Sequence, residues 1–280
     1  MAYAPTKTID FQSKYQHIKL SEDPFSHGDY VLLLDGAWQF ASFSSFKYDE
    51  SIMSIPLAAA PSINRVLICG GGDGMAVREA LKFSDTQQIV LAEIDPVMIE
   101  IFKGEFAFLN NKALQDTDRL SIKIGDAIAY ADSQPPESFD FITLDFPSPS
   151  KKNKQKHYEN LYAPKVIEKF IRLLGSHGTI SAQISVNTDV LAPVIRLLLA
   201  KGFRVWTYDT YYDNRGNHDS FLVACRRGLA QERDLPANLR FATKEHIESA
   251  FGQSQEITKD DLNHYRLFHH SERIDYESPV

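Results

Sequence analysis

The pattern of hydrophobic and polar residues divides the chain into a short β-rich start and a longer alternation of strands and helices. Residues 7–20 and 30–43 alternate partly between apolar and polar positions, with turn signals at Gly28-Asp29 and Asp35-Gly36. Such alternation, broken by short turns, is typical of antiparallel strands. The first 60 residues therefore predict a small antiparallel β unit.

From Arg65 onward, short apolar runs alternate with stretches that suit a helix. We expect strands over 65–69, 88–93, 120–124, 139–144 and 178–183, and helices over about 75–83, 96–108, 162–174 and 188–201. This alternation predicts an α/β fold with a Rossmann-like, doubly wound, largely parallel sheet. The runs 203–208 and 220–225 are expected to close its edge as an antiparallel pair.

Three parts of the chain follow from these patterns. We expect an N-terminal antiparallel β domain over 1–60, a Rossmann-like catalytic domain over 61–228, and a C-terminal appendage over 229–280 with a helix at 243–251. The appendage is assigned no chemistry. His269-His270 could be metal ligands, but no further ligand stands at a suitable spacing, so we expect a solvated tail and no metal.

Composition and charge narrow the class of ligand. Of 280 residues, 43% are hydrophobic and 24% charged, as in an ordinary globular protein, and the net charge of −7 argues against a broad nucleic-acid surface. Cationic ligands fit that charge better. Cys69 and Cys225 each lie in or at the end of an apolar run, so two reduced core thiols are expected. Without a signal-like start or a long apolar run, we expect a cytoplasmic protein with no membrane partner.

The loop Gly70-Gly71-Gly72-Asp73-Gly74 joins the first strand of the alternation to its helix. Its glycines let the backbone approach a ligand closely, and the helix offers its N-terminal amides. The dinucleotide spacing fails, because Met75 stands at the third glycine and Asp73 would place a carboxylate beside a pyrophosphate. A carboxylate suits a cationic sulfonium nucleoside instead.

Two further acids follow strands of the same sheet. Glu93 ends the second strand, near the spacing at which an acid accepts both hydroxyls of a ribose, although alone it equally fits a surface acid. Gly125-Asp126 follows a later strand, where the carboxylate could accept from an adenine amino group, although the pair alone also fits a turn. Together with the loop, these acids predict a nucleoside site.

Asp145 is the predicted catalytic residue. The apolar strand 139–144 delivers it to the sheet edge, and Pro147 and Pro149 stiffen the chain that follows. A carboxylate held there could accept a proton from an attacking amine and stabilise positive charge. The alternative is a helix-capping or turn acid.

In this order the motifs resemble the spermidine synthase family of aminopropyltransferases, over about residues 11–225. The matching segments are Tyr15-Gln16-His17-Ile18, 31–36, the loop 70–74, Glu93-Ile94-Asp95, Gly125-Asp126, Asp145, Leu161-Tyr162 and Gln183. The tail over 235–241 resembles the end of longer bacterial synthases more weakly.

The resemblance implies a fold of the class I methyltransferase type and no permanently bound cofactor. It implies decarboxylated S-adenosylmethionine as donor, a polyamine or diamine as acceptor, methylthioadenosine as product, and a homodimer or homotetramer. The residues that would hold the donor are Gln16, the loop Gly70 to Gly74 with Asp73, Glu93 and Asp126. Asp145 and Tyr48 would position and deprotonate the acceptor amine, and Gln183 would line its channel.

Departures from the family concern the acceptor. Ser148 stands where the family normally has a second aspartate for the far ammonium, a loss worth about 2–5 kcal/mol. Putrescine is therefore not assured. Asp49 and Asp213 could supply an acid placed differently. The segment 146–162 is a candidate lid whose lysines at 151–156 would repel polycations, unless they form a solvated loop.

Two other functions stay open from the sequence. One is an S-adenosylmethionine-dependent methyltransferase, or another sulfonium-using transferase, on the same fold. The other is a non-catalytic nucleoside-binding paralogue, against which the intact Asp145 and Tyr48 count.

Overall fold

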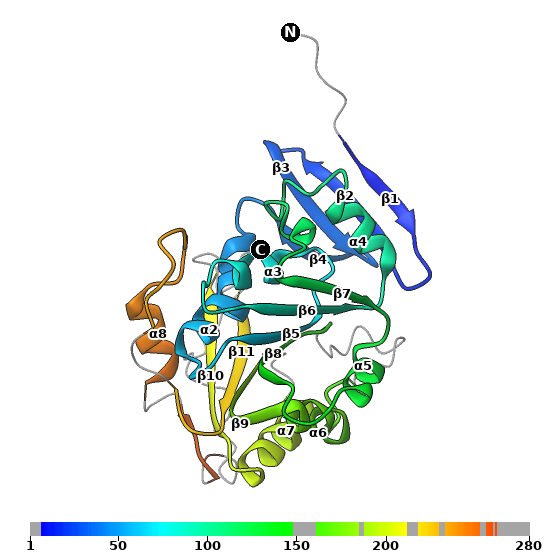
Figure 1. Cartoon of the computed structure of the whole chain (residues 1–280). Coiled ribbons are helices and arrows are strands. Elements are labelled where there is room, and N and C mark those ends of the chain that lie inside the picture. The colour runs from blue at the N-terminus through cyan, green and yellow to red at the C-terminus, as the bar shows by residue number, and fades with distance from the viewer. Residues whose placement is uncertain are drawn as a thin grey trace, which may run out of the picture.

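The computed structural model describes residues 7–147, 161–184, 188–211, 218–229, 233–252, 256–259 and 261 (Figure 1). Ser148, Asp213 and the lysine segment 151–156 lie outside the described residues. Within the described part, a small antiparallel sheet lies at one end of a larger mixed sheet that helices cover on both faces. The predicted fold class is confirmed.

The small sheet consists of β1 (Ile9–Gln12), β2 (His17–Asp23), β3 (Ser26–Leu34) and β4 (Ala37–Ala41), paired antiparallel in that order. Successive side chains of its strands point to opposite faces: Ile18 and Leu20 are buried while Lys19 between them is exposed. The turn between β3 and β4 has positive φ at both Asp35 and Gly36, which suits a tight hairpin. The turn predicted at Asp35-Gly36 is therefore confirmed, but the one predicted at Gly28-Asp29 is wrong: these residues lie within β3, and the chain turns before them at Pro24-Phe25.

The large sheet has the strand order β12-β10-β11-β9-β8-β5-β6-β7. Its parallel strands are β5 (Arg65–Gly70), β6 (Gln88–Glu93), β7 (Leu120–Ile124), β8 (Phe139–Asp145) and β9 (Leu174–Ile184). The antiparallel strands are β10 (Arg204–Tyr211), β11 (His218–Cys225) and β12 (Glu256–Ile257). The strand order reverses between β5 and β8, and a ligand crevice is expected at the carboxyl edge there.

Alternate residues of β5 explain the two layers of helices. Val66 and Ile68 face the core that includes α3 (Met75–Leu81) and α4 (Pro96–Lys103). Leu67 and Cys69 face the opposite core, which α5 (Ala127–Ser133), α6 (Pro164–Leu173) and α7 (Thr188–Ala200) cover. A strand covered on both faces reads as a continuous apolar run, as this one does.

Helix α4 is shorter than the sequence predicted. The pattern predicted a helix over 96–108, but α4 ends at Lys103. Gly104 leaves the helical conformation with φ −97° and ψ −115°, although its N–H still donates to the carbonyl of Glu100. The residues beyond Gly104 form turns, in which Phe106 stays fully buried, so the apolar pattern continued past the end of the helix.

Three short helical segments run without a break from residue 45 to residue 59. They are α1 (Ser45–Asp49), the π-helical η1 (Glu50–Ser54) and α2 (Ile55–Ala59). η1 contacts α3, β8 and β9, so this segment packs on the large sheet and not within the small one. π-helical turns occur frequently at functional sites, and Tyr48 lies just before this one. The domain boundaries at 60 and 228 stay predictions.

The C-terminal part contributes α8 (Lys244–Phe251), which packs beside β10 and α2. Phe251 meets Trp206 and Tyr208 edge to face. η2 (Ala113–Gln115) packs against α3 and α4.

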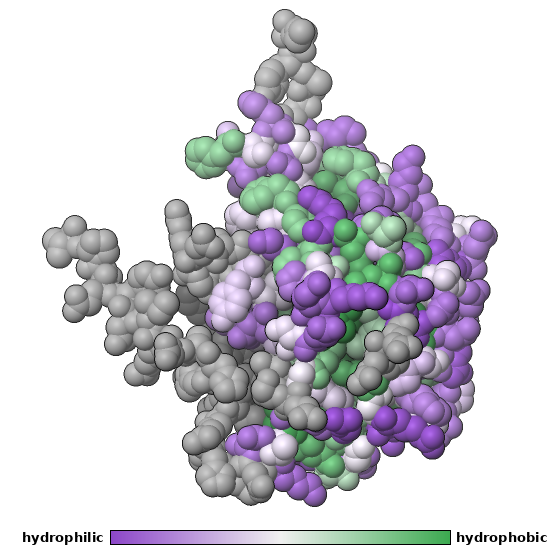
Figure 2. Space-filling model, turned by 90° about the vertical axis from the view of Figure 1, so that its left-hand side faces the viewer, coloured by the Kyte–Doolittle hydropathy of each residue, from purple (hydrophilic) through white to green (hydrophobic). Residues whose placement is uncertain are grey.

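The face on the left of Figure 1 carries hydrophobic residues interleaved with hydrophilic ones (Figure 2). Among the described residues, none of the helices has the length and apolar character to span a membrane.

Candidate active site

Three of the predicted site elements meet at the carboxyl edge of the large sheet. Gly70 at the end of β5 stands in register with Asp145 at the end of β8, and Glu93 ends β6 on the other side of β5. Because β5, β6 and β8 are parallel neighbours, their carboxyl ends place the glycine loop between the two acids. The structure therefore brings together the loop and both acids that the sequence singled out.

The glycines of the loop are required by close contacts with those acids. Gly70 has φ +83°, and a Cβ there would lie 2.3 Å from the carbonyl oxygen of Asp145. A Cβ at Gly72 would lie 2.9 Å from Oε2 of Glu93. A side chain at Gly72 would displace the Glu93 carboxylate, and one at Gly70 would displace the backbone of Asp145, so glycine here shapes the site as well as the turn.

Asp73 lies in the loop, two residues before α3 begins. Its Oδ1 accepts a hydrogen bond from the backbone N–H of Met75 at 3.0 Å, and its carbonyl accepts one from Asn110 Nδ2 at 2.8 Å. Burial raises the pKa of Asp73, against the opposing effects of the Met75 N–H and the Arg78 charge. A buried carboxylate with a raised pKa is one that a cation would stabilise in its charged form.

Glu93 is buried at the end of β6. Its Oε1 accepts a hydrogen bond from the N–H of Asp95 at 2.7 Å. Burial, aided by repulsion from Asp95 and Asp73, raises the pKa of Glu93 to about 7 despite that bond. Hydroxyl donors of a ribose would favour the ionised form of such a group.

Asp95 ties the small sheet to this strand end. Its Oδ2 accepts hydrogen bonds from Ser13 Oγ at 2.7 Å and Gln16 Nε2 at 3.1 Å, while Oδ1 accepts from the N–H of Val97 and caps α4. Gln16 is thus held at the site across 79 positions. The sequence treated Asp95 only as part of a motif; its place directly before Pro96 was the available signal for a capping acid.

Asp126 lies at the same edge, after β7. Its Oδ1 accepts from the N–H of Ile128 at 2.8 Å and caps α5, and the side chain is exposed. Gly125 donates its N–H to the carbonyl of Glu93 at 2.8 Å, so the two acids follow adjacent strands. The cap accounts for one oxygen of Asp126; contact with an adenine stays a prediction.

Tyr48 and Asp145 form the centre of the acceptor side. Tyr48 Oη donates to Asp145 Oδ1 at 2.6 Å, and Oδ2 of Asp145 faces the loop, where a Cβ on Gly71 would lie 2.9 Å away. Burial, followed by repulsion from Asp73, raises the pKa of Asp145 to about 7, while the Tyr48 bond opposes this rise. Burial and the Asp145 charge raise the pKa of Tyr48. A carboxylate with a pKa near neutrality is suited to proton transfer.

Gln183 and two residues that the sequence did not single out as site residues complete this side. Gln183 Oε1 lies 3.3 Å from Tyr48 Oη, and its Nε2 donates to Asp219 Oδ1 at 3.0 Å. Tyr162 Oη donates to the carbonyls of Gln183 at 3.0 Å and Phe146 at 3.3 Å. Leu161-Tyr162 had been noted only as a motif. Nothing in the linear order pointed to Asp219, because it reaches this edge at the start of an antiparallel strand.

Asp49, predicted as a substitute acidic anchor for the acceptor, forms an ion pair with Arg78 of the protein itself. It is buried, and its Oδ2 lies 2.6 Å from Nη2 of Arg78 on α3. Burial alone would lower the pKa of Arg78, but the charges of Asp49 and Glu79 raise it. An acceptor ammonium would have to compete with this guanidinium for Asp49.

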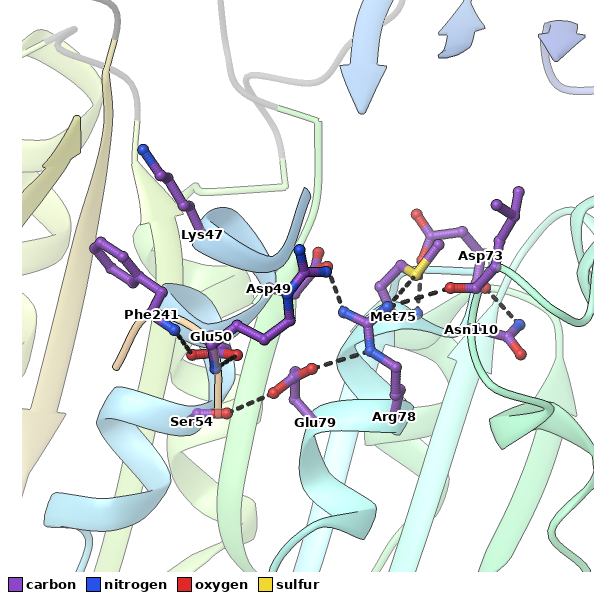
Figure 3. A network of polar contacts seen from close by, with 12 residues as sticks. Lys47, Asp49, Glu50, Ser54, Asp73, Met75, Arg78, Glu79, Asn110 and Phe241 are labelled. Carbon is purple, nitrogen blue, oxygen red and sulfur yellow. Dashed lines mark hydrogen bonds and ion pairs between the residues drawn. The ribbon is translucent and has the colours of Figure 1, made fainter. Parts of the chain in front are cut away.

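A chain of buried charges continues from Arg78 away from the loop (Figure 3). Arg78 Nε donates to Glu79 Oε1 at 3.0 Å, and Glu79 Oε2 accepts from Ser54 Oγ at 2.8 Å and pairs with Lys82 at 2.7 Å. Lys82 also lies 3.6 Å from Glu50. Buried charges are tolerated when each has partners of opposite sign, as these have.

Glu50 joins this chain to the C-terminal part. Its two oxygens accept hydrogen bonds of 2.7 to 2.8 Å from the backbone N–H groups of Arg240, Phe241 and Ala242. Glu50 is fully buried and stands two residues after Tyr48. The C-terminal segment is therefore anchored to Glu50, two residues along the chain from a predicted catalytic residue; Figure 3 shows the bond from Phe241.

Comparison with known proteins identifies the family of this chain. The sequence model of the spermine/spermidine synthase domain matches residues 45–195, more than half of the chain. The chain belongs to this family. The match includes the glycine loop, Glu93, Asp145 and Gln183. Among the described residues, no group of three or more His, Cys, Asp or Glu is arranged to hold a metal.

Curated relatives carry the name polyamine aminopropyltransferase. The one from Oceanobacillus iheyensis is 27% identical over 88% of this chain and 48% of the relative; that from Leptospira interrogans is 26% identical over 95% and 52%. The chain thus spans about half the length of these two relatives. The one from Clostridium tetani is 28% identical over 83% of this chain and 81% of its own length.

Solved structures confirm the fold of this family member. The spermidine synthase from Thermotoga maritima superposes with a TM-score of 0.72 at 22% identity, covering 88% of this chain and 83% of that one. A spermidine synthase in complex with the transition state analogue AdoDATO gives a TM-score of 0.70 at 21% identity, covering 88% and 82%.

Proposed function

We propose that this protein transfers an aminopropyl group from decarboxylated S-adenosylmethionine to an amine and releases methylthioadenosine. The observation that carries the proposal is the Tyr48–Asp145 hydrogen bond beside the glycine loop, with Glu93 on the loop's other side. Family membership and the names of the curated relatives support it.

The donor half of the site suits a nucleoside sulfonium. Glu93 would accept the ribose hydroxyls, Asp73 would stabilise the cationic tail, and Asp126 would accept from the adenine amino group. Gln16 would close this half from the small sheet, held by Asp95. Burial raises the pKa of Glu93 and of Asp73 and so disfavours their ionised forms. The positive charge of the donor would offset this effect and favour the ionised carboxylates.

The chemical step is an in-line displacement. The lone pair of the neutral amine forms a bond to the carbon beside the sulfonium, the C–S bond breaks, and its electron pair stays on sulfur. Asp145 takes the proton that the amine loses, and Tyr48 orients the carboxylate by its hydrogen bond. Alignment of the amine in a closed site supplies much of the acceleration.

The acceptor is a diamine of the putrescine class or a related amine. A net charge of −7 and the acids Asp145 and Asp219 favour a polycation over an anionic substrate. Further acceptor contacts at Ser148 and Asp213 stay predictions. We place the reaction in the cytoplasm, in a homodimer or homotetramer.

The test is the release of methylthioadenosine from decarboxylated S-adenosylmethionine by purified protein, with and without each member of a panel of diamines and polyamines. We expect release only when an amine is present. No release with any amine would contradict the proposal. Tighter calorimetric binding of the carboxylated donor would then support a methyltransferase, and binding without turnover of either donor would support a non-catalytic nucleoside-binding protein.

A further inference from the structure

Gln183 lies between two acidic side chains, and this fixes which way its amide faces. Nε2 donates to Asp219 Oδ1 at 3.0 Å, and Oε1 lies 3.3 Å from Tyr48 Oη. The Asp219 oxygen at this contact is a hydrogen-bond acceptor, so the NH₂ group of the amide lies on its side. The carbonyl oxygen of Gln183 is thereby turned toward Tyr48 and Asp145.

The sheet holds Asp219 in this place from both sides. β11 runs antiparallel to β9, with Ser220 opposite Ile184, so the start of β11 lies beside the carboxyl end of β9 that carries Gln183. On the other side, Asp219 stands opposite Thr210 of β10. Pairing with β10 fixes the backbone of Asp219, and a side chain carried by a paired strand is a rigid support for its neighbour.

The direction of the amide matters for an attacking amine. The amine presents N–H groups, and these need acceptors if its lone pair is to point at the donor carbon. Asp145 supplies one acceptor, and Oε1 of Gln183 supplies a second nearby. An NH₂ group in the place of Oε1 would face the N–H groups of the amine with another donor and turn the lone pair away.

Building on the proposed aminopropyl transfer, we propose that Asp219 is a positioning residue for the acceptor amine. It acts through Gln183, whose amide it locks so that Oε1 accepts an N–H of the amine beside Asp145. Asp219 also adds to the negative charge of the acceptor side: burial and Asp73 are the main causes of the raised pKa of Asp145, and Asp219 contributes to it.

Four proteins test whether Asp219 orients the amide of Gln183: the wild type, Asp219→Asn, Gln183→Glu and the double variant. Gln183→Glu places two carboxylates at the 3.0 Å contact. In the double variant the amide introduced at 219 donates to the carboxylate introduced at 183, whose other oxygen still faces Tyr48. The hydrogen bond is thus restored in the reverse direction. Assays at about pH 9 keep the close carboxylate pair of Gln183→Glu ionised.

Under saturating donor we expect kcat to fall about threefold in Asp219→Asn, whose amide permits both orientations of Gln183, and about tenfold or more in Gln183→Glu. The double variant should recover to within about threefold of the wild type. Asp209→Asn, an exposed acid on β10 that accepts from Ser220 Oγ, is the matched control and should leave kcat unchanged.

Thermal unfolding of the same four proteins without ligand tests the contact independently of catalysis. Gln183→Glu should lower Tm by roughly 2–4 °C, and the double variant should regain it. An inactive wild type overturns the proposed function, and with it the catalytic half of this inference. An active wild type whose double variant is no better than Gln183→Glu, in kcat and in Tm, overturns the inference alone.

Discussion

Tyr48 Oη donates a hydrogen bond of 2.6 Å to Asp145 Oδ1 across 97 positions of sequence. Tyr48 comes from the short helix before the π-helical turn, and Asp145 from the end of a central strand. The bond joins the two elements at the edge where the glycine loop lies. It fixes one oxygen of the carboxylate and leaves the other on the side of the loop.

Tyr48→Phe removes this bond without changing the shape of the ring. Because the bond opposes the rise in the pKa of Asp145, its loss should move that pKa above about 7 and reduce the ionised fraction at neutral pH. We expect kcat to fall about tenfold at pH 7 and the fall to shrink as pH rises. Steady-state kinetics between about pH 6 and 9 measure this.

The control for that variant is Tyr30→Phe in the small sheet, whose ring packs against Phe106 and Phe108 and keeps those contacts as phenylalanine. It should behave as the wild type. A constant loss of rate in Tyr48→Phe at every pH would contradict the role given to the hydrogen bond.

The pH dependence of kcat/KM for the donor should report two carboxyl groups. Asp145 must be ionised to accept a proton and Glu93 to accept ribose hydroxyls, and both have a pKa raised to about 7. Activity should therefore fall as pH drops through about 7, with a slope steeper than that of one proton. Glu93→Gln should leave a one-proton slope. A single-proton limb near pH 4 in the wild type would contradict these assignments.

Asp145→Asn should make the folded protein more stable above pH 7. The folded pKa of Asp145, about 7, exceeds its ordinary value of 3.8, so the native state binds the extra proton between these values and loses stability as pH rises through them. Above pH 7 the free energy of unfolding of the variant should exceed that of the wild type by about 1–2 kcal/mol, a value reduced because the Asp145 side chain is partly exposed to solvent. Below about pH 4 the gain should vanish.

Denaturant unfolding at pH 4 and pH 8 measures that difference. Asp132→Asn, on the exposed face of α5 where the acid pairs with Lys169, is the matched control and should show no gain at either pH. Equal stability of Asp145→Asn and the wild type at pH 8 would mean that the carboxylate is not held at a cost to folding.

The positions that could be predicted are those fixed by parallel topology. Carboxyl ends of adjacent parallel strands meet at one edge, so Glu93, Asp145 and the loop after β5 had to lie close together once the strands were recognised. The helices near 75–83, 162–174 and 188–201 followed from periodicity in the same way, whereas the helix at 96–108 was predicted too long and α5 was not predicted.

Other parts of the site depend on contacts that periodicity does not encode. Asp219 reaches Gln183 through the register of an antiparallel pair, and Gln16 reaches Asp95 from a separate sheet. Asp49 looked like a possible substrate anchor because its partner, Arg78, lies 29 positions away on another helix. Such pairings are set by how elements pack, which a single sequence does not reveal.

Glu50→Gln should detach the C-terminal segment. The carboxylate accepts three backbone N–H groups from residues 240–242 and lies near Lys82, and an amide would turn a donor toward these donors. We expect a loss of about 3–5 kcal/mol in the free energy of unfolding, or cleavage within 233–252 under limited proteolysis. Glu168→Gln, an exposed acid on α6, is the control. Unchanged unfolding and proteolysis would contradict the anchor.

The central claim is that Asp145 accepts the proton of an attacking amine in aminopropyl transfer. The most direct measurement is the amine-dependent release of methylthioadenosine from decarboxylated S-adenosylmethionine by the wild type and Asp145→Asn, with donor binding followed by calorimetry. We predict release by the wild type only with an amine, a loss of about 100-fold or more in kcat for the variant, and similar donor affinity in both. Full activity in Asp145→Asn, or release that does not depend on an amine, would contradict the account.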